Sequence, residues 1–358
     1  MNRKNSLFKQ APDVGNPRGT ILIVTLWILL ILTLFALALG ERASLEVNLT
    51  KYQRDKAKAI RLAQAAIERA IWEKLNNDTE ENSDSFHEPW ANNQAAFKDV
   101  QLGAGTFTVG YSIDASTLDE NKITFYGLED EQSKININNV KQKVLKHLLE
   151  SCGVVDFSAA AQSILVWSGK MPDTGDEEGT YYENLDPPYP LKAEEFQSLG
   201  ELLLVQHFSP AIVYGGQDEN GDVYPGLSRY LTVYGEDQVN INTASQKVLL
   251  ALTEGDLTLV DKVMQYRRGY DGEIGTEDDN IFTLDSQKFA VNEAWADYGE
   301  SEDLPSLNNV IPQEQRCVSS DIYTISAKAE VKRVRKTITA TVSIPKTGPV
   351  QYLYWHQN

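Results

Sequence analysis

Residues 20–40 read TILIVTLWILLILTLFALALG, and this stretch carries no charged side chain. An uncharged apolar run of this length is able to cross a bilayer core of about 30 Å as a helix. The residues before it carry several basic side chains and only one acid, Asp13. Because excess Lys and Arg mark the cytoplasmic side of a span, the sequence predicts a single-pass protein of the bacterial inner membrane. Its N-terminus is expected in the cytoplasm and the bulk of the chain in the periplasm.

A cleaved secretory signal peptide is the alternative interpretation of this run. Signal peptides have an apolar region of about 7–15 residues followed by a small-residue cleavage site. The run here is longer, and Gly40-Glu41-Arg42 after it is a poor cleavage site. The more distinctive break lies before the run, between Gly19 and Thr20.

The helical pattern continues beyond the apolar run. Apolar residues recur in steps of three, four or seven along residues 45–75, with basic and acidic residues between them, which is typical of an amphipathic helix. At 1.5 Å per residue, residues 20–75 predict one helix of roughly 80 Å. A membrane anchor alone needs no such extension, whereas a subunit that packs its helix among similar helices does.

A basic leader that ends in Gly19, an apolar segment and an amphipathic half resemble the class III prepilins and pseudopilins. The resemblance implies that prepilin peptidase cuts between Gly19 and Thr20 and that the new N-terminus is methylated. Most members carry Glu at mature position five, where this chain has Val24. The absence of Glu at this position is characteristic of one branch of the family, so the chain resembles the K-type minor pseudopilins of type II secretion systems.

Composition limits the class of partner and the redox chemistry. The chain has 358 residues, 51 acids and 33 bases, for a net charge of −18. Nucleic acids reward basic surfaces, so no nucleic acid is expected as a partner. Outside the cytoplasm, the two cysteines, Cys152 and Cys317, are candidates for a disulfide, although the sequence alone does not bring them together.

A repeat lies in the middle of the chain. Residues 135–150 read ININNVKQKVLKHLLE and residues 239–254 read VNINTASQKVLLALTE, with Asn136 matching Asn240 and Asn138 matching Asn242. A helix is predicted in each copy, with an asparagine or Thr243 as its N-cap, and a second helix near residues 157–167 or 257–268. The paired helices resemble helix–hairpin–helix modules, but neither turn has the Gly-x-Gly that such modules use to bind phosphates, so structural packing is the favoured role.

Alternating strand patterns flank this helical region. Residues 105–113 and 122–128 precede it, and residues 323–329 and 338–344 follow it. The sequence therefore predicts an α+β fold: a long N-terminal helix on an antiparallel sheet, with a large helical insertion of two related (SAM-like) hairpins. The expected parts are leader 1–19, helix 20–78 with its transmembrane part 20–40, sheet 79–132 and 319–346, inserted domain 133–318 and tail 347–358.

This order of elements also resembles the K-type pseudopilins, whose sheet is interrupted by a helical domain. The resemblance implies a non-enzymatic subunit that initiates and caps the periplasmic pseudopilus during export across the outer membrane. It implies I- and J-type minor pseudopilins, prepilin peptidase and the inner-membrane secretion platform as partners. The alternatives are a membrane-anchored periplasmic hydrolase and a helix–hairpin–helix binding protein. No hydrolase, P-loop or dinucleotide-binding motif appears in the sequence.

Two loops concentrate the oxygen ligands that Ca²⁺ prefers. The metal candidates are Asp271, Asp278 and Asp279 in one loop, and Asp218, Asn220 and Asp222 in the other. Neither loop has the EF-hand spacing, and the same residues are common in solvated turns. Because family members bind calcium in the helical domain, the resemblance implies a structural calcium ion. The loop with Asp271, Asp278 and Asp279 is the better candidate.

Overall fold

The computed structural model describes residues 17–76, 82–114, 122–172, 178–285, 288–290 and 311–358. The chain falls into two compact units, Met1–Ala57 and Lys58–Asn358. Most of the expected leader, residues 1–16, lies outside the described residues.

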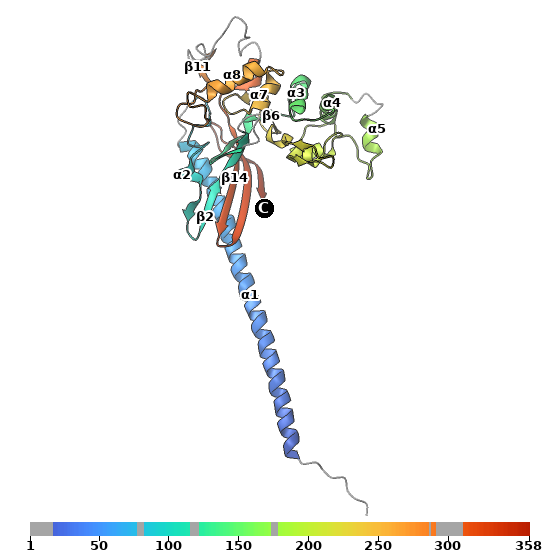
Figure 1. Ribbon diagram of the computed structural model, residues 1–358, viewed down its shortest axis with the longest axis vertical. Helices are drawn as coiled ribbons and strands as arrows, with labels where there is room; N and C mark the ends of the chain where they lie inside the picture. Colours follow the sequence, from blue (N-terminus) through green and yellow to red (C-terminus); the bar gives the residue numbers. More distant parts are fainter. Residues whose placement is uncertain (1–16, 77–81, 115–121, 173–177, 286–287, 291–310) are drawn as a thin grey trace, which may run out of the picture. The chain divides into compact units, whose positions relative to one another are not determined.

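Helix α1 (Pro17–Asn76) is continuous over 60 residues (Figure 1). In the first unit, every side chain from residue 20 to residue 54 is exposed, including the large apolar ones. By length and composition, this helix is able to cross a membrane. The expected transmembrane segment, residues 20–40, therefore lies in the exposed apolar part of this helix, which fits a single-pass anchor.

The second unit begins within α1 and uses small residues for packing. Ala59, Ala63, Ala66 and Ala70 are fully buried, and their spacing places them on one face of the helix. They belong to the same core cluster as the inner face of the main sheet. Alanine has little side chain, so this face lets the helix lie close to the strands.

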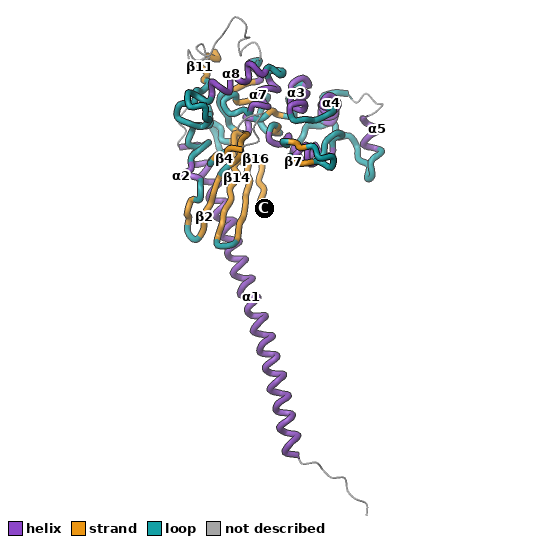
Figure 2. Tube along the Cα trace, in the orientation of Figure 1, coloured by secondary structure: helices purple, strands orange, loops and turns teal. Residues whose placement is uncertain are grey.

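The main sheet has six strands and is antiparallel. Alternate residues of β14, including Tyr323, Ile325 and Ala327, are fully buried toward α1, as a half-buried strand requires. Figure 2 shows β2, β14 and β16 among its strands. The order is β1 (Val100–Leu102), β2 (Gly105–Val109), β14 (Ile322–Val331), β15 (Val334–Ser343) and β16 (Gln351–Gln357), with β5 (Glu129–Asp130) also paired to β14.

The expected tail, residues 347–358, is wrong as a description of this segment. Residues 351–357 form β16, which pairs with β15 along its length. Its side chains are exposed, so the segment lacks the alternation of burial that marks a half-buried strand. The backbone hydrogen bonds of an edge strand leave little trace in a sequence.

The expected strand over residues 105–113 divides at Gly110. β2 stays in the main sheet, whereas β3 (Tyr111–Asp114) pairs with β4 (Lys122–Phe125) in a separate ribbon. A Cβ at Gly110 would lie 2.7 Å from the carbonyl oxygen of Phe125. The glycine therefore permits the close approach at which the chain leaves the sheet.

The insertion contains two related copies, copy 1 (residues 135–232) and copy 2 (residues 239–317). Each begins with a short strand that pairs in parallel with the strand at its end, β6 with β9 and β10 with β13. Each then forms two helices. The bounds are β6 (Ile135–Asn136), α3 (Gln142–Ser151), α4 (Phe157–Trp167) and β9 (Leu231–Thr232), then β10 (Val239–Asn240), α7 (Gln246–Leu252), α8 (Leu257–Arg267) and β13 (Arg316–Cys317).

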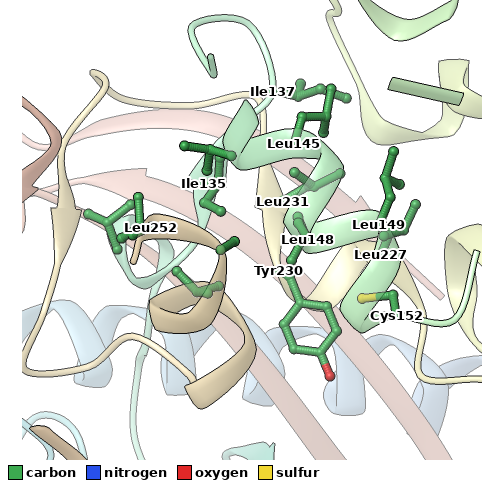
Figure 3. Close-up of a cluster of buried hydrophobic side chains, with 14 of the residues drawn as sticks. Ile135, Ile137, Leu145, Leu148, Leu149, Cys152, Leu227, Tyr230, Leu231 and Leu252 are labelled. Carbon is green, nitrogen blue, oxygen red and sulfur yellow. The ribbon is translucent and has the colours of Figure 1, made fainter. Parts of the chain in front are cut away.

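The two copies share one hydrophobic core rather than forming separate domains. Leu145 and Leu148 of α3 belong to the same buried cluster as Leu249 and Leu252 of α7. Figure 3 shows Leu145, Leu148 and Leu252 in this cluster. A repeat whose apolar stripe needs a neighbour to cover it is typical of stacked helical units.

Shorter elements complete the second unit. They are α2 (Gln94–Phe97), η1 (Glu131–Ser133), α5 (Glu178–Glu183), η2 (Leu199–Leu204), α6 (Pro210–Tyr214), β7 (Gly216–Gln217), β8 (Val223–Tyr224), η3 (Leu227–Arg229), β11 (Thr283–Asp285), β12 (Lys288–Ala290) and η4 (Gln313–Gln315).

Candidate functional site

The side chain of the second asparagine of each repeat is hydrogen-bonded to the backbone of a distant loop. In copy 1, Asn138 Nδ2 donates to the carbonyl oxygen of Phe196 at 2.9 Å, and the amide of Phe196 donates back to Asn138 Oδ1 at 2.8 Å. In copy 2, Asn242 makes the same pair with Phe282 at 2.9 and 2.8 Å. Both side chains are buried. The motif thus supplies a buried amide that satisfies both polar groups of one backbone unit.

These asparagines are not helix N-caps, so that expectation is wrong. Helix α3 is preceded by Lys141, which makes no side-chain cap bond, and α7 is capped by Ser245. The hydroxyl of Ser245 accepts from the amide of Val248. The asparagines lie several residues earlier, because a turn separates each short strand from its helix.

The first asparagine of each repeat differs between the copies. Asn136 and Asn240 each accept a hydrogen bond from the amide two residues later, at 2.9 and 3.0 Å. The Asn136 amide then donates to the carbonyl of Gly235 at 2.7 Å, in the segment that links the copies. Asn240 instead lies in a buried polar junction beside the main sheet.

In this junction the Asn240 side chain donates to three oxygens. They belong to Asp84 (backbone, 3.1 Å), Asp130 (Oδ2, 2.9 Å) and Ser320 (Oγ, 3.1 Å). Ser320 also donates its hydroxyl to Asp130 at 2.8 Å and its amide to Asp84 Oδ2 at 2.6 Å. The network therefore joins β10 of the insertion to β5 and to the residues just before β14.

Two carboxylates are buried in the junction, with Asp84 and Asp130 each 2% exposed. Lys74 of α1 pairs with Asp84. Asp130 has no lysine or arginine within ion-pair distance in the described part of the chain and relies on hydroxyl and amide donors. Burial raises the pKa of Asp130 to about 6 despite those hydrogen bonds, and the charge of Asp84 raises it further.

The junction was not predicted from the sequence. Asp84 and Asp130 lie in ordinary acidic stretches, and their partners are up to 239 positions away in the chain. Only Asn240 carried a signal, as part of the repeat. Periodicity shows which face of an element is buried, but it does not show which buried polar groups meet.

The acidic loop after α8 is closed by its own hydrogen bonds. Asp278 Oδ2 accepts from the amides of Tyr270 and Asp271 at 2.7 and 3.0 Å, and Asp279 Oδ2 accepts from Gly275 at 2.7 Å. Bonds from the Thr276 hydroxyl and the Asp271 amide lower the pKa of Asp278 to about 2. Burial raises the pKa of Asp279.

These carboxylates do not form a ready cation cage. Among the described residues, no group of three or more His, Cys, Asp or Glu side chains is placed to hold a metal ion. Asp271 uses one oxygen to accept from the amide of Glu273. Calcium at Asp271, Asp278 and Asp279 stays a prediction.

The second metal candidate is a hairpin turn. Asp218 Oδ1 accepts from the amides of Asn220 and Asp222, both at 2.9 Å, between β7 and β8. This is the local bonding that makes Asp common in turns. The pattern explains the residues of this loop without a metal.

The two cysteines are not joined by a disulfide. Cys152 ends α3 inside the apolar cluster of copy 1 (Figure 3), whereas Cys317 lies in β13, which pairs with β10. The disulfide candidate from the sequence is therefore not formed in this structure. The two cysteines are 165 positions apart, and the sequence alone did not show which neighbours the fold would give each of them.

The predicted processing residues lie at the start of α1. The helix begins at Pro17, so the Gly19–Thr20 bond falls in its first turns. Val24 is 54% exposed and belongs to the uncharged part of the helix.

Two comparisons with known proteins bear on this architecture. Residues 121–214 match the family model of the type II secretion system (T2SS), protein K. The fold is similar to GspK in the crystal structure of the GspK–GspI–GspJ complex from the enterotoxigenic Escherichia coli type 2 secretion system. That match has a TM-score of 0.58 and 16% sequence identity, and it covers 86% of this chain and 99% of that one. A search of curated proteins finds no significant match.

Together these matches support a K-type minor pseudopilin and confirm the resemblance drawn from the leader, the helix and the repeats. They also confirm the α+β pilin-like fold. Proteins of the K family are structural components, so the family match supports a non-enzymatic subunit.

Proposed function

We propose that this chain initiates and caps the periplasmic pseudopilus of a type II secretion system, which exports proteins across the outer membrane. The observation that carries the proposal is one helix with two environments. Its first part is apolar and fully exposed, and its second part packs on a sheet interrupted by a K-family insertion. A subunit held in the inner membrane and then withdrawn into a filament needs both parts.

The first step in this role is removal of the leader by prepilin peptidase between Gly19 and Thr20, followed by N-terminal methylation. A glycine before the cut gives the enzyme access to the backbone at the membrane face. N-terminal sequencing and mass measurement of the mature chain test the step. We expect Gly19→Leu to block cleavage. A mature start near Glu41 would contradict it.

Val24 supports a place at the tip of the filament. A subunit inside the shaft needs an acid at this position to pair with the N-terminus of a neighbour, and valine offers no charge or acceptor. An unpaired carboxylate in lipid costs several kcal/mol, so an apolar residue suits a top position. The bulky insertion also suits a cap better than a tightly packed shaft.

The expected partners are the I- and J-type minor pseudopilins, because the similar GspK occurs in a complex with GspI and GspJ. The inner-membrane secretion platform is expected to receive the assembled tip. Co-purification of the full chain with both partners in detergent tests the complex, and immunogold labelling of filaments tests the position. Labelling spread evenly along the shaft would refute the tip assignment, even if the partners co-purify.

Calcium is proposed as a structural ion of the loop after α8. Binding to the folded state alone raises stability by RT ln(1 + [L]/Kd), about 1.4 kcal/mol at a tenfold excess over Kd. The test is the melting temperature of the full chain in detergent with calcium and with EGTA, for the wild type and Asp271→Asn. If calcium does not raise the melting temperature of the wild type, the proposal is wrong. If calcium raises the melting temperature of Asp271→Asn by the same amount, calcium binds at another site.

A further inference from the structure

The hairpin between β7 and β8 contains the only asparagine in the sequence that is followed by glycine. This pair is Asn220 and Gly221. Both residues and the next one, Asp222, are exposed at the tip of the hairpin. The ribbon below the tip holds only two cross-strand residue pairs. Because a ribbon of two short strands is marginally stable on its own, the tip is able to open locally.

The side chain of Asn220 is not held by the fold. Its backbone amide donates to Asp218 Oδ1 at 2.9 Å, but its side-chain amide makes no hydrogen bond to any described residue. The buried asparagines of the repeats are different, since Asn138 and Asn242 each bind a distant backbone through both side-chain atoms. The carbonyl carbon of the Asn220 side chain is therefore free to turn toward its own backbone.

The backbone nitrogen of Gly221 is the nearest nucleophile to that carbon along the chain. Gly221 has a φ of +95°, which glycine adopts readily, and it has no Cβ to shield its nitrogen. Its amide donates to the carbonyl oxygen of Asp218 at 3.2 Å, at the long end of the range for such bonds. This one hydrogen bond has to break before the nitrogen is able to react.

We propose that Asn220 is a site of spontaneous deamidation in the folded chain. The Gly221 amide gives its proton to hydroxide, and its nitrogen attacks Cγ of Asn220. The new C–N bond closes a succinimide ring, while the bond from Cγ to Nδ2 breaks and Nδ2 leaves as ammonia. Water then opens the ring at either carbonyl and leaves aspartate or isoaspartate at position 220. No atom is oxidised or reduced, and water is the only co-reactant.

The reaction changes the charge and the backbone of the hairpin. The new carboxylate lies between Asp218 and Asp222 in the sequence, so it adds a negative charge beside two others, which repel it. Isoaspartate also adds a methylene to the main chain. This alters the spacing at which Asp218 Oδ1 accepts from the amides of Asn220 and Asp222, both at 2.9 Å. An aged chain therefore differs from a new one by a more acidic and more open hairpin tip in copy 1.

The test incubates the full chain in detergent at neutral pH and follows Asn220 by peptide mapping with mass spectrometry. A free peptide of residues 216–225 provides the rate without the fold. We expect a mass increase of about 1 Da at Asn220, at a rate about tenfold below that of the peptide because one hydrogen bond has to break. The rate should rise with hydroxide concentration. Isoaspartate is detected separately as a methyl acceptor for protein isoaspartyl methyltransferase.

Asn220→Gln is the matched control, because the longer side chain would have to close a larger ring, which is slow, and it should accept no methyl groups. Asn240 is the control within the same digest. It is fully buried, hydrogen-bonded and followed by Ile241, so its mass should stay constant. If Asn220 stays intact while the free peptide converts completely, the proposal is wrong. Methyl acceptance that persists in Asn220→Gln would place the reaction at another residue and would also overturn it.

Discussion

The two copies of the repeat use the same motif for different purposes. The second asparagine does the same work in both, because Asn138 and Asn242 bind Phe196 and Phe282 with matching geometry. The first asparagine does not. Asn136 binds the linker between the copies, whereas Asn240 holds a buried junction with two carboxylates. A shared motif thus fixes the internal fold of each copy, while its surroundings decide which copy is joined to the sheet.

This difference assigns the attachment of the insertion to copy 2. The network of Asn240, Asp130 and Ser320 connects β10, β5 and the start of β14. Copy 1 reaches copy 2 mainly through the helices α3 and α7 and their common core. Substituting the second asparagine should therefore cost the same free energy of unfolding in both copies. Substituting the first asparagine should cost more in copy 2 than in copy 1.

The largest effect is expected at the first asparagine. Asn240→Ala removes donors to Asp84, Asp130 and Ser320 in a fully buried site, and we expect a loss of about 3 kcal/mol in the free energy of unfolding. Asn136→Ala removes its contact with Gly235 at a more accessible edge and should cost about 1 kcal/mol. Urea unfolding of the full chain in detergent, followed by tryptophan fluorescence, measures both. Equal losses would break the proposed division between the copies.

The next effect concerns the pH dependence of the junction. The pKa of Asp130 is raised to about 6 in the folded chain, above the ordinary value of the unfolded carboxyl. The folded state therefore binds the proton more tightly, so this contribution to stability is complete below about pH 4 and is lost as the pH rises through 6. Its full size is about 3 kcal/mol.

Asp130→Asn isolates this effect from the other carboxyls. The amide does not titrate, so the stability of the wild type relative to the variant should fall between pH 4 and pH 7. Any constant cost of the substitution, including its contact with the amide of Gln132, cancels in that comparison. If the difference in unfolding free energy between the wild type and Asp130→Asn stays constant from pH 4 to pH 7, Asp130 is not the proton-binding group. The same conclusion follows if the wild type becomes relatively more stable as the pH rises.

Much of the fold was predictable because apolar residues recur in the sequence with the spacing of a helix or of a strand. The second helix of copy 1 was expected over residues 157–167 and is α4 over the same residues, and that of copy 2 was expected over 257–268 and ends one residue earlier. The junction and β16 were not predictable. Contacts among Asp84, Asp130 and Asn240 join distant parts of the chain, and an exposed edge strand has no buried face to give it a period.

The second asparagines should give intermediate and equal effects. Asn138→Ala and Asn242→Ala each remove two hydrogen bonds to the backbone of a buried phenylalanine, and we expect each to cost about 2 kcal/mol. Hydrogen exchange followed by mass spectrometry locates the change, which should be faster exchange at Phe196 in one variant and at Phe282 in the other. Losses that differ by more than about 1 kcal/mol would mean that the two locks are not equivalent.

The smallest effects are expected where the copies touch through lysines. Lys143 of copy 1 pairs with Glu254 of copy 2 on the exposed surface, and Lys247 of copy 2 donates to the carbonyl of Ser151 in copy 1 at 2.6 Å. Water screens the exposed pair, so Lys143→Ala should cost less than about 0.5 kcal/mol. Lys247 is half-buried and binds the carbonyl end of α3, where a cation is favoured, so Lys247→Ala should cost about 1 kcal/mol. The same urea experiment measures both, with Lys58→Ala at an exposed position of α1 as a control for loss of a positive charge. If Lys143→Ala proves the more costly of the two, the contact between the copies depends on the exposed ion pair and not on the capped helix end.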